Sequence, residues 1–158
     1  GGVHPAAARA PPAWLAARHR HQRAARCGRP RRNVIDSSAW LEYFADGPNA
    51  DVFAPAIEAP ETQCVPAITL LEVFKRVAQQ RDEGAALQCV AVMQQGRVVD
   101  LDAALALRAA ALGLRHKLPL ADSIVYATAQ AHAATVWTQG ADFEHLPGVE
   151  FRAKAQKP

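Results

Sequence analysis

The sequence predicts an α/β domain of three layers, in which helices cover both faces of a short parallel sheet. From residue 33 onward, short apolar runs typical of strands alternate with longer stretches of helical periodicity. Such alternation indicates crossover connections between parallel strands. The chain has 158 residues, half of them hydrophobic, which suits one globular domain with a buried core. No apolar run is long enough to cross a membrane.

The first strand and helix carry the clearest signals. Residues 33–36 form an apolar strand that ends on a carboxylate, and Ser37 or Ser38 can cap the helix that follows through Phe44. A Gly-Pro-Asn sequence interrupts this helix, and a second helix is expected over residues 51–59.

The middle of the chain repeats the pattern. Residues 62–65 are expected to form a strand that ends at Pro66. The next helix has an apolar stripe at core-facing spacing, formed by Leu70, Val73, Phe74 and Val77. Another helix is expected from Asp82 to about residue 95, with Leu87, Val90 and Ala91 on one side.

The remaining elements complete the alternation of strands and helices. They are a strand at 97–100, a helix over 103–117, a helix from Pro119 to residue 131, a strand at 135–138 and a short strand at 149–151. Together with the earlier elements they predict five strands in one parallel sheet.

Charge divides the chain into two parts. Residues 1–32 contain eight arginines, no lysine and no acid, whereas residues 33–158 contain the other ten basic residues and all fifteen acids, a net charge of −5. The first part lacks both a core pattern and a signal peptide, so we expect a disordered leader at 1–32, a domain at 33–152 and a tail at 153–158. A basic arm that binds nucleic acid and an organelle transit peptide are the alternatives for the leader.

Cysteine and histidine provide no catalytic or metal-binding pattern. The cysteines Cys27, Cys64 and Cys89 have neither disulfide-framework nor zinc spacing, which favours a reducing, cytoplasmic compartment. Cys64 and Cys89 lie in apolar runs and are expected to be buried. The domain histidines lack matching partners and are interpreted as surface residues: His116, His132 and His145.

If the strands run parallel, four acids can lie at the edge where such a sheet forms its binding crevice: Asp36 and Asp142 after strands, Asp122 in the first turn of a helix, and Glu72 one to two turns into another. Each also has a purely structural explanation. Asp36 can cap a helix, Glu72 can pair with Arg76 at i+4, Asp122 can complement a helix dipole, and Asp142 can be a solvated loop charge.

The apolar surroundings of two of these acids favour a functional interpretation. Leu and Val side chains flank both Glu72 and Asp122, and an uncompensated charge there is costly. Carboxylates brought together repel one another unless a cation joins them, and oxygen ligands select hard ions such as Mg²⁺ or Mn²⁺. The sequence has no glycine-rich phosphate loop and no nucleophile elbow. The acids therefore predict a divalent metal site.

The same residues carry a family resemblance. Val34-Ile35-Asp36-Ser37-Ser38-Ala39-Trp40-Leu41 resembles the opening motif of PIN-domain ribonucleases, the VapC-type toxins of toxin–antitoxin pairs. The resemblance continues in order through residues 71–73, 118–123 and 138–143, and it covers residues 33 to about 152.

The resemblance implies a Rossmann-like PIN fold and metal-dependent hydrolysis of RNA by the toxin of a type II toxin–antitoxin system. Asp36 and Asp122 would be the principal ligands of Mg²⁺ or Mn²⁺, Glu72 and Asp142 would complete the catalytic acids, and Ser38 would support them by hydrogen bonding. Homodimerisation and a cognate antitoxin are also implied. Because the domain is acidic, phosphate contacts would have to come from local basic residues such as Lys75 and Arg76.

The last motif departs from the family pattern. The family has an acid or Asn two residues after the conserved Thr, and this chain has Gly140 there, while Asp142 matches the second acid. A PIN scaffold that binds RNA or an antitoxin without cleaving is therefore the alternative function. A phosphate-accepting receiver domain is a weaker third hypothesis, because lysine is scarce.

Overall fold

The computed structural model describes residues 31–156, and nearly all of the predicted leader lies outside that range. Helices and short strands alternate along the described chain. They are β1 (Asn33–Ile35), α2 (Ser37–Phe44), α3 (Ala50–Ile57), η1 (Pro60–Thr62), β2 (Cys64–Pro66), α4 (Ala67–Gln80), α5 (Glu83–Met93), β3 (Arg97–Val99), α6 (Ala103–His116), α7 (Leu120–Ala131), β4 (Thr135–Thr138), η2 (Ala141–Phe143) and β5 (Val149–Phe151). Every predicted strand and helix is present within a few residues.

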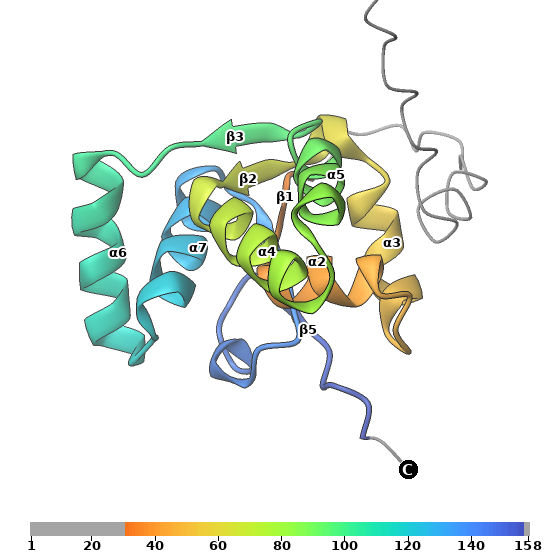
Figure 1. The fold of residues 1–158 in the computed structure, drawn as a ribbon. Coiled ribbons are helices and arrows are strands. Elements are labelled where there is room, and N and C mark those ends of the chain that lie inside the picture. The colour runs from red at the N-terminus through yellow and green to blue at the C-terminus, as the bar shows by residue number, and fades with distance from the viewer. Residues whose placement is uncertain (1–30, 157–158) are drawn as a thin grey trace, which may run out of the picture.

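The strands run parallel, as predicted, but they form two sheets rather than one. One sheet has the order β1-β4-β5, and the other pairs β2 with β3. A single parallel bridge between Asn33 and Gln63 joins them. The helices lie around these two short sheets (Figure 1). Because all strands are parallel, their carboxyl ends lie at the same edge, where β1 leads into α2 and β4 leads into η2.

The helix ends follow from local chemistry. Asp82 begins α5 and Asp102 begins α6, and each side chain accepts a hydrogen bond from a backbone N–H three residues later, at 2.7 and 2.8 Å. Helix α6 ends where Lys117 adopts a left-handed conformation with φ of 55°. Pro119 then precedes α7, whose middle is buried on nearly all sides.

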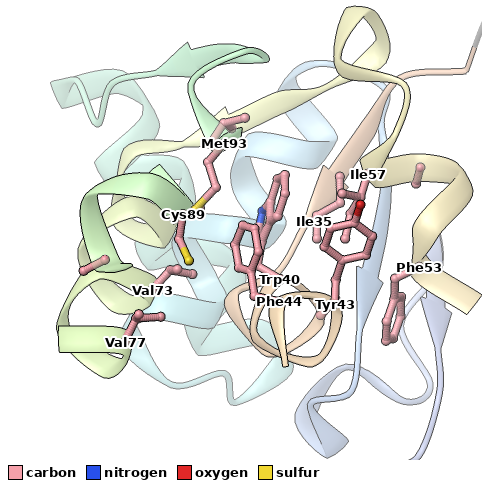
Figure 2. Close-up of a cluster of buried hydrophobic side chains, with 14 residues drawn as sticks. Ile35, Trp40, Tyr43, Phe44, Phe53, Ile57, Val73, Val77, Cys89 and Met93 are labelled. Atoms are coloured by element: carbon pink, nitrogen blue, oxygen red, sulfur yellow. The ribbon is translucent and has the colours of Figure 1, made fainter. Parts of the chain in front are cut away.

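The larger of the two hydrophobic clusters surrounds α2. Figure 2 shows Trp40 and Phe44 of this helix between the α4–α5 pair and β1, and their rings stack at 5.6 Å. The predicted α4 stripe is confirmed, because Val73 and Val77 are buried and Leu70 and Phe74 pack against the cluster.

The side of α5 that carries Leu87, Val90 and Ala91 is not its buried face. Leu87 is 56 % exposed, and the buried positions are Ala86, Cys89 and Met93. Small side chains at 86 and 89 let α5 pack closely against α4, while the bulkier Leu87 points away.

The described cysteines are buried, as predicted. Cys64 and Cys89 are free thiols, and Cys27 lies outside the described residues. Burial raises the pKa of Cys89 to about 11 and also raises the pKa of Cys64. Both therefore pack as small hydrophobic residues.

The domain boundary remains a prediction that truncation can test. Every member of the two described hydrophobic clusters lies between Val34 and Val149, and the backbone carbonyl of Arg32 accepts a hydrogen bond from Thr135 N–H at 2.9 Å. We therefore expect a chain that begins at Arg31 to melt at the same temperature as the full chain. A fall of more than about 3 °C would place part of the core before residue 31.

Candidate active site

Asp36 is the most deeply buried of the four predicted acids. It follows β1 and is 4 % exposed. Its Oδ2 accepts hydrogen bonds from Ser38 Oγ and Thr138 Oγ1, both at 2.8 Å. Although Asp36 occupies the N-cap position of α2, its side chain makes no capping hydrogen bond. The capping explanation therefore fails, and the carboxylate is held instead by one hydroxyl from the first turn of α2 and one from the end of β4.

Glu72 is partly buried on α4. Burial raises its pKa first, the nearby Asp36 charge raises it further, and a hydrogen bond with Ser37 lowers it. Its Oε1 is buried without a hydrogen-bond partner, and no ion pair with Arg76 is found within residues 31–156. The ion-pair explanation is therefore not supported, and a buried carboxylate oxygen is left without compensation.

Asp122 links all four acids electrostatically. It lies in the first turn of α7, and burial raises its pKa to about 7, with further contributions from Asp36, Asp142 and Glu72 in that order. A carboxylate with this pKa is poorly compensated by the protein itself. The other three predicted acids thus lie within electrostatic reach of Asp122, with Asp142 as the exposed member in η2.

The donor set suits a hard divalent ion, although the acids do not form a closed cage. Within residues 31–156, no three His, Cys, Asp or Glu side chains lie close enough together to hold an ion. A cation bound here would give the unpartnered oxygen of Glu72 a partner, and it would lower the raised pKa of Asp122. Carboxylate oxygens are the ligands that Mg²⁺ and Mn²⁺ prefer.

Two further residues contact the candidate site, and neither was given a role from the sequence, although both lie in the last family motif. Thr138 is fully buried, donates to Asp36 and accepts the N–H of Gly140 at 2.9 Å. Gln139 is 5 % exposed, and its backbone N–H donates to Ser38 Oγ at 3.0 Å. Both lie at the carboxyl end of β4, and a polar pair that ends a buried strand was the available signal.

Gly140 departs from the family pattern without any unusual backbone geometry. Its φ of −74° and ψ of 121° are extended values that any residue adopts. A Cβ at this position would lie 3.8 Å from Asp36 Oδ2, 3.2 Å from Thr138 Oγ1 and 3.3 Å from Phe143 Cδ2. The position therefore faces the acid site. A side chain there would contact Thr138 and Phe143 closely, but it could be accommodated by small shifts of these neighbours.

The histidines lie apart from this network. His145 is exposed, as predicted, whereas His116 and His132 are partly buried, and His116 contacts the Tyr126 ring edge-on at 5.7 Å. Burial lowers the pKa of His132, as do Arg97 and Arg32. No histidine contributes to the raised pKa values of Glu72 and Asp122.

Comparison with known proteins gives one family and several related structures. The family model described as PIN domain matches residues 34–149. A toxin–antitoxin complex from Klebsiella pneumoniae has a TM-score of 0.63 and 27 % identity, covering 75 % of this chain and 95 % of that chain. No match is found among curated proteins.

Two other structures support the fold alone. VapC20 of Mycobacterium tuberculosis, described as a Sarcin-Ricin loop cleaving toxin, has a TM-score of 0.63 at 20 % identity, covering 76 % of this chain and 98 % of that one. VapBC2 from Rickettsia felis bound to promoter DNA has a TM-score of 0.59 at 12 % identity, covering 77 % and 97 %.

Proposed function

The chain belongs to the PIN-domain family, and from this membership we propose that it is a metal-dependent endoribonuclease, the toxin of a type II toxin–antitoxin pair. One observation carries the proposal: burial and the charges of Asp36, Asp142 and Glu72 raise the pKa of Asp122 to about 7. Four interacting acids at one sheet edge form an oxygen-rich site that a divalent ion would stabilise.

Asp36 and Asp122 are proposed as the principal ligands of Mg²⁺ or Mn²⁺, with Glu72 and Asp142 completing the site. When bound, the ion would neutralise phosphoryl charge and make water more acidic. Ser38 and Thr138 both donate to Oδ2 of Asp36, which orients the carboxylate, and no hydrogen bond from the described residues occupies Oδ1. Oδ1 is therefore the oxygen available to a ligand.

RNA binding requires local positive charge, because residues 33–158 have a net charge of −5. Lys75 and Arg76 are exposed and lie within about one turn of Glu72 on α4. Arg152 is a further candidate that the sequence analysis did not identify. Its backbone N–H donates to Thr138 O at 3.0 Å, so its backbone lies beside the end of β4. Its side chain is exposed.

Protein partners are proposed from the relative and from the surface. The Klebsiella structure is a toxin–antitoxin complex, and we extend an antitoxin partner to this chain. Homodimerisation is proposed from the resemblance to PIN-domain toxins. The surface supports protein contacts, because three leucines on α6 and at the start of α7 are at least 75 % exposed: Leu107, Leu114 and Leu120. In the described residues, no helix is long and apolar enough to cross a membrane.

The proposal is tested by incubating the protein with structured RNAs, with Mn²⁺ or with EDTA. We expect cleavage that requires the metal and is lost on chelation. Binding without cleavage would instead favour the scaffold alternative, which the absence of a ligand at Gly140 supports. Cleavage that persists in EDTA would contradict the metal-dependent mechanism.

Metal binding is expected to weaken as the pH falls. The folded-state pKa of Asp122 is about 7, so the ion must displace a proton from this side chain in acidic solution. We expect calorimetric titrations to show that Mn²⁺ affinity falls about eight-fold when the pH is lowered from about 7.5 to about 6. The proton released is measured by repeating the titration in buffers of different ionisation enthalpy. A flat affinity across this range would exclude Asp122 as a ligand.

A further inference from the structure

Gln139 is a buried side chain whose hydrogen-bonding groups are used at both ends. Its Nε2 donates to Glu42 Oε2 at 2.8 Å and to Ser38 O at 3.3 Å. Its Oε1 accepts from Asn49 Nδ2 at 2.8 Å. Because the amide is 5 % exposed and both donor hydrogens and the acceptor have partners, Gln139 is held in one orientation.

The partners of Gln139 come from segments far apart in the sequence. Ser38 and Glu42 belong to α2, and Asn49 lies in the loop before α3. Asn49 uses no side-chain atom to cap α3, and its Nδ2 donates a second hydrogen bond to Ala153 O at 2.9 Å. Gln139 therefore joins the carboxyl end of β4 to α2 and, through Asn49, to the chain that follows β5.

The backbone N–H of Gln139 occupies one acceptor position of the Ser38 hydroxyl. A backbone N–H can only donate, so Ser38 Oγ accepts the bond from Gln139 N. Ser38 then directs its own proton to Asp36 Oδ2 at 2.8 Å. Thr138 behaves alike, because it accepts the N–H of Gly140 and donates to the same oxygen of Asp36. The position of the β4 end thus fixes both donors on Asp36.

We propose that Gln139 is a positioning residue of the metal site, which holds the end of β4 against α2 and so keeps Ser38 and Thr138 aligned on Asp36. This inference rests on the proposed function in that Asp36 is taken as a metal ligand. Removing the Gln139 amide leaves the Glu42 carboxylate, the Ser38 carbonyl and the Asn49 amide without their shared partner. The end of β4 then loses its side-chain links to α2 and keeps the backbone hydrogen bond from Gln139 N–H to Ser38 Oγ. Ser38 and Thr138 are held less firmly, so the Asp36 carboxylate is less well oriented.

The test compares Mn²⁺ affinity in two variants that lose similar buried amides. Gln139→Leu removes the amide at the site. Gln63→Leu removes one at the opposite edge of the sheet, where Gln63 is 3 % exposed and its Nε2 donates to Ala56 O and Ile57 O at 3.0 and 2.7 Å. Both variants are expected to melt at lower temperature. Only Gln139→Leu is expected to bind Mn²⁺ more weakly, by about ten-fold, when measured well below its melting temperature.

Asn49→Ala supplies a milder variant in case Gln139→Leu does not fold. It removes a neutral side chain that is partly exposed and leaves Gln139 Oε1 unpaired, so we expect Mn²⁺ affinity to fall about three-fold. In a separate assay of RNA cleavage, Asn49→Ala is expected to lower kcat with little change in KM.

The results separate this inference from the proposed function. Weaker Mn²⁺ binding in Gln139→Leu but not in Gln63→Leu supports the positioning role, even if the wild-type chain cleaves none of the RNAs offered. Unchanged Mn²⁺ affinity in folded Gln139→Leu or Asn49→Ala overturns it, even if the wild-type chain is an active ribonuclease. Equal losses of affinity in Gln139→Leu and Gln63→Leu also overturn it, because the effect would then be one of general stability.

Discussion

The Asp122→Asn variant is expected to lose Mn²⁺ binding and RNA cleavage while melting at a higher temperature than the wild-type chain without metal. Its carboxyl has a folded-state pKa of about 7 against an ordinary value of 3.8, mainly because of burial and then because of Asp36, Asp142 and Glu72. At neutral pH and above, the folded protein holds an unfavourable negative charge at this position. Asparagine keeps the shape and removes the charge.

The sign of the pH dependence follows from the raised pKa. The neutral carboxyl favours the folded state fully below about pH 4, and this stability is lost as the pH rises through about 7. At pH 8 we therefore expect Asp122→Asn to be more stable by about 2 kcal/mol, after a reduction for partial exposure. This corresponds to a rise in Tm of roughly 5–10 °C. The advantage is expected to disappear below about pH 4, where both side chains are neutral.

Two matched variants accompany this measurement. Asp36→Asn is expected to abolish Mn²⁺ binding and cleavage as well, because it removes charge from the carboxylate that Ser38 and Thr138 orient. Glu61→Gln changes the net charge equally at an exposed position before β2 and is expected to leave metal binding unchanged. Unchanged Mn²⁺ affinity in both aspartate variants would show that the site has been assigned to the wrong residues.

Much of the fold could be predicted from the sequence, because its signals are local. Apolar pairs such as Val34-Ile35 mark strands, and caps such as Asp82 and Asp102 mark helix starts, so element types and bounds were predicted closely. The division of the sheet was not predicted, since it depends on how β1 and β2 diverge after a single bridge. The buried face of α5 was not predicted, because hydrophobicity alone ignores how closely two helices pack, and Leu87 is exposed.

The candidate site divides in the same way. The four acids were identified because charges flanked by apolar residues and placed at strand ends are visible in a sequence. Thr138 and Gln139 were given no role in the site from the sequence, because their role comes from hydrogen bonds to Asp36 and Ser38 about a hundred residues away. Such partners are created by the parallel pairing of β1 with β4. Their identification required the structure.

The Gly140→Asp variant is expected to cleave RNA at least about ten-fold faster than the wild-type chain, if one contact worth ~1.4 kcal/mol in the transition state is gained. The backbone accepts the change, because Gly140 has φ of −74° and ψ of 121°. The new Cβ would lie 3.8 Å from Asp36 Oδ2, so the added carboxylate enters the acid site directly. Mn²⁺ affinity is expected to rise with the cleavage rate.

The same substitution is expected to lower stability in the absence of metal, because a further negative charge is placed beside Asp36. Gly140→Ala is the control for crowding, since its Cβ meets Thr138 and Phe143 at 3.2 and 3.3 Å without adding a ligand. In EDTA, Gly140→Asp should therefore melt at a lower temperature than Gly140→Ala. When Mn²⁺ is added, this difference in melting temperature should disappear or reverse. If Gly140→Asp folds as well as Gly140→Ala and cleaves no faster than the wild-type chain, Asp142 already supplies the ligand, and the glycine costs the enzyme nothing.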